Sequence, residues 1–161
     1  MEKHWSLAAT AILLVAGCSK QDQPVKKDVK ALMAQHVQPT TQTYWDAVQF
    51  VSDASGAREI VPKNDAEWQR TAEAAKMLKQ LAEELKDPGY AEGRGSDWQA
   101  FAQGLADVSE QAQQAAEQKS PEKVLEAGGT LYNVCSACHE VYMPSPGGLV
   151  PTDQNAATPT Q

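Results

Sequence analysis

The residues with the most distinctive chemistry lie near the end of the chain, at positions 135 to 139. Cys135, Cys138 and His139 belong to the segment Cys-Ser-Ala-Cys-His, which has the C-x-x-C-H spacing of a c-type haem attachment site. Each thiol can add to one vinyl group of the haem, and the adjacent imidazole can bind the iron. We therefore expect one covalent haem c, held by thioethers at both cysteines, with His139 as the proximal axial ligand.

Two other uses of a paired cysteine motif fit this sequence less well. A structural zinc site needs four ligands, and the only other cysteine and histidine residues are Cys18, His4 and His36. A thioredoxin-like redox pair is expected near a βαβ pattern, which the sequence lacks. Covalent haem attachment is the better interpretation of the motif.

The N-terminus has the pattern of an export signal, expected over residues 1–17. Its apolar run is shorter than the roughly 20 residues that a membrane-spanning helix needs. The segment Leu-Val-Ala-Gly-Cys, which ends at Cys18, resembles the lipobox of bacterial lipoproteins. The resemblance implies cleavage after residue 17 and lipid attachment to Cys18, and an ordinary secretory signal is the alternative. Both place the protein on the periplasmic side of a bacterial membrane, where c-type haem is attached.

Several acyl chains would anchor the protein firmly to a membrane, and Ser19 slightly favours the outer one. Residues 18–24 form a short tether, and residues 144–161 are expected to be a disordered tail, since they contain few apolar groups. The formal net charge of −7 excludes nucleic acid as a natural partner and suits a basic redox protein.

The composition between the tether and the haem motif favours helices. The first is expected over about residues 25–55, with Pro39 kinking or briefly interrupting it and Gly56 capping its C-terminus. The second helix is expected to begin at Asn64 or Asp65 and to end at about residue 86. The third is expected to begin at a cap at Ser96 or Asp97 and to end at about residue 119. The fourth is expected to begin at a cap at Ser120 and to end at about Tyr142. The last helix carries the haem motif in its second half.

An all-α chain with C-x-x-C-H near the end of its last helix is similar to the class II cytochromes c, the cytochrome c-prime type. The resemblance covers about residues 25–143. It rests on the motif, on Tyr142, and on the segment Leu-Met-Ala-Gln-His at 32–36. It implies an antiparallel four-helix bundle with the haem between helices, a first helix that faces the distal side, and a possible homodimer.

The sequence departs from that family at Met143, where cytochromes c-prime commonly carry arginine or lysine. This departure and the expected kink at Pro39 favour the six-coordinate relatives over the gas-binding members. The first helix offers the distal ligand. Met33 has a family precedent and a thioether that raises the reduction potential, although such methionines often only fill a core. His36 is the rival ligand, and a vacant position is the third alternative.

These expectations describe a membrane-tethered electron carrier that exchanges electrons with redox protein partners and is not an enzyme. The alternative is a five-coordinate haem protein that binds or scavenges nitric oxide or carbon monoxide. A peroxidase would need a polar distal group, for which only His36 is available.

Overall fold

The computed structural model of the protein describes residues 24–143. The expected signal segment, the expected lipid attachment site at Cys18, nearly all of the tether and the expected tail lie outside this range. The described part is mostly helical and contains one small two-stranded antiparallel sheet. Over residues 24–143, no helix has the length and apolar character needed to cross a membrane.

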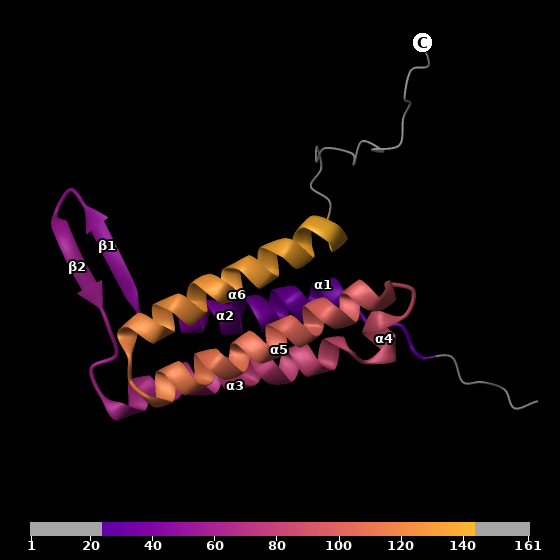
Figure 1. Ribbon diagram of the computed structural model, residues 1–161, viewed down its shortest axis with the longest axis horizontal. Helices are drawn as coiled ribbons and strands as arrows, with labels where there is room; N and C mark the ends of the chain where they lie inside the picture. Colours follow the sequence, from indigo (N-terminus) through magenta and orange to yellow (C-terminus); the bar gives the residue numbers. More distant parts are fainter. Residues whose placement is uncertain (1–23, 144–161) are drawn as a thin grey trace, which may run out of the picture.

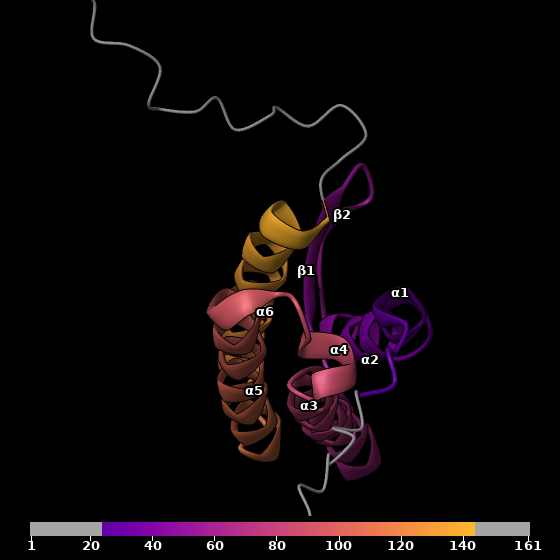
Figure 2. The same ribbon diagram turned by 90° about the vertical axis from the view of Figure 1, so that its right-hand side faces the viewer.

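The elements follow one another from a broken first helix to a long last one. In chain order they are α1 (Val29–Leu32), the π-helical turn η1 (Met33–Val37), α2 (Gln38–Trp45), β1 (Gln49–Asp53), β2 (Gly56–Ile60), α3 (Asp65–Leu85), α4 (Pro88–Ala91), α5 (Gly95–Glu117) and α6 (Pro121–Tyr142). Helix α5 lies between α3 and α6, and α2 packs on α3 (Figures 1 and 2). The hairpin extends beyond the helices at the end where α6 begins (Figure 1).

Two of the long helices begin at the caps that the sequence predicts. The Asn64 side chain accepts a hydrogen bond from the Glu67 amide at 3.0 Å, and the Ser120 hydroxyl accepts one from the Lys123 amide at 3.4 Å. Such caps satisfy amide groups that the first helical turn leaves unpaired. The cap predicted at Ser96 or Asp97 is wrong, because α5 begins at Gly95 and has no side-chain cap.

The first helix is shorter than predicted, and Pro39 does not interrupt it. Instead, the chain widens into η1, in which the Gln38 amide donates to the carbonyl of Met33, five residues earlier. In an α-helix, Pro39 would lack the amide that bonds to residue 35, and its ring would crowd that carbonyl. The π-helical turn, placed just before the proline, lets the helix continue as α2 to Trp45.

Residues 46–55, predicted as the end of the first helix, instead leave the helix, and residues 49–60 form a hairpin. Strand β1 pairs with β2, so that Phe50 faces Glu59 and Val51 faces Arg58. The Asp53 carboxylate accepts from the Ser55 amide at 2.9 Å, and Gly56 follows with a φ of 114°. An Asx turn and a positive-φ glycine are hairpin signals, so Gly56 is not a helix cap.

The core lies where the apolar faces of α2, α3, α5 and α6 meet. Val25, where the first helix is predicted to begin, lies before α1 and is 85% exposed, and His36 is also exposed. The fully enclosed large side chains include Tyr44, Leu78 and Leu131, and the Tyr44 hydroxyl donates to the carbonyl of Ala112 at 3.2 Å.

A tryptophan joins the end of α2 to the first half of α6. The indole Nε1 of Trp45 donates to the carbonyl of Gly128 at 2.9 Å. A Cβ added at Gly128 would lie 3.2 Å from Cδ1 of Trp45, whereas one added at Gly129 would meet nothing within 4 Å. The close approach of two helices therefore accounts for the first glycine of this pair, and nothing in the structure explains the second.

Alanine substitutions at these two glycines are expected to have different effects on the free energy of unfolding. Gly129→Ala should raise the free energy of unfolding by up to about 1 kcal/mol, because alanine favours the helix and the site is open. Gly128→Ala should give no gain or a net loss, since the hydrogen bond holds the Trp45 ring against the new methyl group. Urea denaturation of the matured variants measures both values. Equal stabilisation by the two substitutions would contradict the close approach at Gly128.

Candidate haem-attachment site

The three motif side chains lie together in the second half of α6. Cys135, Cys138 and His139 are each half-buried. Residues three and four apart share one face of a helix, so the two thiols and the imidazole project from about one turn of α6. We call residues 135–139, where the sequence predicts haem attachment, the haem-attachment turn. The structure thus brings together all three residues that the motif predicts.

The two thiols have an environment that suits structural cysteines. Neither is in a disulfide. Burial raises the pKa of Cys135, and burial together with the neighbouring Cys135 raises the pKa of Cys138, while the positive charge of Arg94 lowers it. A reactive redox pair needs a lowered thiol pKa. The surroundings therefore give no support to the thioredoxin-like alternative.

An aromatic cluster holds the last turn of α6 against the start of α5. The Tyr142 hydroxyl donates to the backbone carbonyl of Arg94 at 2.7 Å. The Tyr142 ring meets Trp98 edge to face, with 5.0 Å between ring centroids, and the Trp98 indole donates to the carbonyl of Leu85 at 2.7 Å. Because Tyr142 follows His139 by three residues, these contacts fix the direction in which α6 presents the haem-attachment turn.

Removal of the Tyr142 hydroxyl is expected to weaken this contact. Tyr142→Phe should lower the free energy of unfolding by about 0.5–1.5 kcal/mol, because the carbonyl of Arg94 loses a part-buried donor. Urea denaturation measures the change. Tyr132→Phe is the matched control, since the Tyr132 side chain is 61% exposed, and it should have almost no effect. A loss no larger than that of the control would show that the hydroxyl of Tyr142 does not anchor α6.

The two residues predicted as distal ligands differ in their surroundings. Met33 opens η1, is half-buried and packs against the core. His36 is exposed and lines a shallow surface depression with Pro39, Met77 and Leu81. Helix α1 and the C-terminal end of α6 lie at the same end of the molecule (Figure 1). Burial therefore favours Met33 over His36 as a residue directed into the protein.

The stripe of α6 that carries His139 also presents exposed apolar groups. Tyr132 lies two turns before His139 and is 61% exposed, and Met143 lies one turn after it and is 60% exposed. These groups suit contact with a flat, largely apolar macrocycle. Across residues 24–143, no three His, Cys, Asp or Glu side chains gather as a metal site. A porphyrin supplies its own four nitrogen ligands, so a haem needs no such group.

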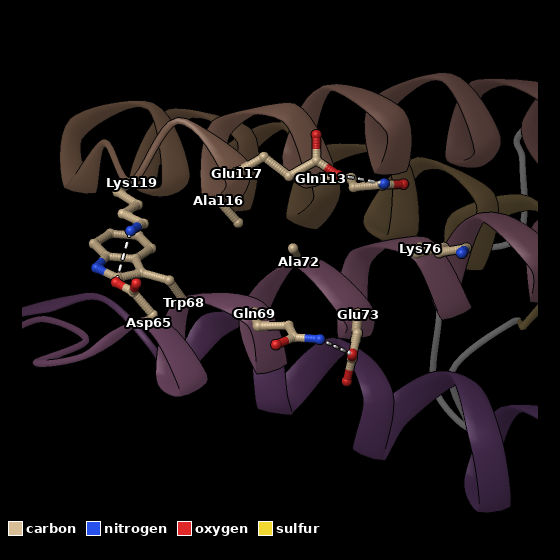
Figure 3. A pocket seen from close by; sticks show the side chains of 10 residues that line it. All are labelled: Asp65, Trp68, Gln69, Ala72, Glu73, Lys76, Gln113, Ala116, Glu117 and Lys119. Carbon is tan, nitrogen blue, oxygen red and sulfur yellow. Dashed lines mark hydrogen bonds and ion pairs between the residues drawn. The ribbon is translucent and has the colours of Figure 1, made fainter.

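A second surface depression lies between α3 and α5 (Figure 3). It is bordered by Trp68 and Ala72 of α3 and by Gln113 and Ala116 of α5. An ion pair of 2.7 Å between Lys119 and Asp65 joins the two helix ends across it. Its other lining groups are mostly glutamine, glutamate and lysine, which are ordinary residues of a solvated helix surface.

Arg94 is the site residue that sequence reasoning did not find. Its neighbours Gly93 and Gly95 have φ values of 75° and 78°, a conformation that other residues rarely adopt. They form the sharp turn that brings Arg94 to the end of α6. The sequence Gly-Arg-Gly signals a turn, but nothing in it indicates which distant helix the arginine meets.

No protein-family model, no curated protein and no solved structure matches this chain.

Proposed function

We propose that this protein is a periplasm-facing monohaem c-type cytochrome that carries electrons, anchored to a membrane through lipid on Cys18. We further propose that its helices form a four-helix bundle of the class II cytochrome c type around the haem. The observation that carries the proposal is the haem-attachment turn. Its two thiols and imidazole project together from one half-buried turn of α6.

The donor set of this turn fits a covalent haem. Cys135 and Cys138 are free thiols on one helix face, as two thioether bonds to one porphyrin require. His139 is next in the chain and is half-buried, so its imidazole is partly shielded from competing water. Bound haem supplies an iron that cycles between the ferric and ferrous states. The protein residues hold that iron, limit its contact with water and leave one side accessible to a redox partner.

Met33 is the distal ligand in this proposal, and His36 is not. Met33 is half-buried at the start of η1, whereas His36 is exposed. Single π-helical turns inside α-helices occur frequently at functional sites. A thioether ligand stabilises ferrous iron and raises the reduction potential, which suits an electron carrier. A filled sixth position also disfavours gas binding.

Optical spectra of the matured protein test this proposal against gas binding. The full chain is produced in a bacterium that attaches c-type haem, and spectra are recorded oxidised, reduced, and reduced with carbon monoxide. Electron transfer through a six-coordinate iron predicts low-spin spectra in both states and no response to carbon monoxide. A high-spin spectrum that changes with carbon monoxide would contradict it and favour the five-coordinate alternative.

A further inference from the structure

A basic side chain lies beside the aromatic cluster at the C-terminal end of α6, although that end of α6 itself carries no arginine or lysine. Arg94 comes from the turn between α4 and α5 and is half-buried. Its backbone carbonyl accepts the hydrogen bond of Tyr142 at 2.7 Å. Since Tyr142 lies one turn beyond Cys138, this bond brings Arg94 to the part of α6 that holds the second thiol.

The guanidinium of Arg94 is held in place rather than left free in solvent. Its carbon lies 4.5 Å from the ring centroid of Trp98, and its Nε donates to the carbonyl of Tyr90 at 2.8 Å. The Trp98 ring in turn contacts Tyr142 edge to face. A stacked and hydrogen-bonded arginine keeps its position and its charge. The guanidinium is therefore held at the aromatic cluster that packs against the last turn of α6.

We propose that Arg94 raises the reduction potential of the haem through its positive charge. This inference rests on the proposed function, because it requires a haem on Cys138. A thioether at Cys138 would hold the porphyrin at that sulfur, and Arg94 would then be a permanent cation near the bound haem. Reduction adds a negative charge to the iron centre. A fixed neighbouring cation therefore stabilises the ferrous state and raises the potential.

Potentiometric titration of the matured full-chain protein tests the role of Arg94. Arg94→Gln removes the charge and is expected to lower the ratio of ferrous to ferric protein at a fixed applied potential by about tenfold, equivalent to about 59 mV for one electron. Arg94→Met removes the charge but keeps an unbranched, apolar side chain, and it should give the same shift. Arg94→Lys retains the charge and should remain close to wild type.

Arg70→Gln is the matched control, because it removes an equal charge from an exposed position on α3 next to the hairpin. It should shift the potential far less than Arg94→Gln. Equal shifts in these two variants would overturn the proposal. A shift in Arg94→Lys as large as in Arg94→Gln would also overturn it, since only the stacking and hydrogen bonding would then matter. Absence of covalent haem from the wild-type protein would instead refute the proposed function itself.

Discussion

Replacement of both Cys135 and Cys138 by alanine is expected to abolish covalent haem attachment. The two thiols are the only groups on the haem-attachment turn that can form thioethers, and His139 alone would leave the haem free to dissociate on denaturation. After denaturing electrophoresis, staining for haem peroxidase activity should mark the wild-type band and leave the double variant unstained. Each single variant, with one thioether remaining, should give a weaker band.

The control for this experiment lies inside the same turn. Ser136 is one of the two residues between the cysteines and is half-buried. Ser136→Ala changes the motif without removing a thiol, so haem attachment should remain at the wild-type level. Retention of haem by the double cysteine variant through denaturation would show that the chain binds haem elsewhere, and the proposed site would be wrong.

Met33→Leu is expected to open the sixth coordination position of the iron. Leucine keeps nearly the volume and apolar character of methionine, so the half-buried position at the start of η1 stays filled while the sulfur is lost. The oxidised spectrum should change from low spin to high spin, the reduced protein should bind carbon monoxide, and the reduction potential should fall. Optical spectra and a potentiometric titration of the matured variant measure these changes.

His36→Ala is the companion variant that separates the two distal candidates. Because His36 is exposed, its removal should leave the spectra and the potential unchanged. If this variant becomes high-spin while Met33→Leu stays low-spin, His36 is the ligand and Met33 only fills the core. If neither variant differs from a high-spin wild type, the distal position is vacant.

The long helices could be predicted from sequence because local signals determine them. Asn64 and Ser120 cap the helices that follow them, and apolar residues recur at helical spacing through α3 and α5. These signals lie within a few residues of the elements that they define. The predicted bounds of α3 and α6 therefore agree closely with the structure.

The region before α3 was harder to predict, because its structure depends on competing signals. Pro39 suggests a break, but a π-helical turn accommodates it, and nothing in the sequence shows that the helix can widen there. The segment around Gly56 was interpreted as a helix end, whereas the same Asp, Ser and Gly residues form a hairpin turn. Polar turn residues end helices and join strands equally well.

Some residues of the candidate site can likewise be predicted from the local sequence, whereas others depend on contacts between distant parts of the chain. The C-x-x-C-H motif is contiguous, so Cys135, Cys138 and His139 could be named from sequence alone. Arg94 and Trp45 contact α6 from 48 and 83 residues away in the chain. Such contacts depend on how the helices pack, which one sequence without relatives does not reveal. Met33 is intermediate, since its helix face was predictable and its partner across the protein was not.

Intact mass under denaturing conditions tests the central claim most directly. The full chain, matured in a bacterium with c-type haem attachment, is unfolded, freed of unattached cofactor and weighed. The proposed function predicts a single species that is heavier than the processed and lipidated polypeptide by one haem, with the haem mass on the peptide that contains Cys135 and Cys138. A mass equal to the polypeptide alone, from cells that attach haem to a known c-type cytochrome, would contradict it.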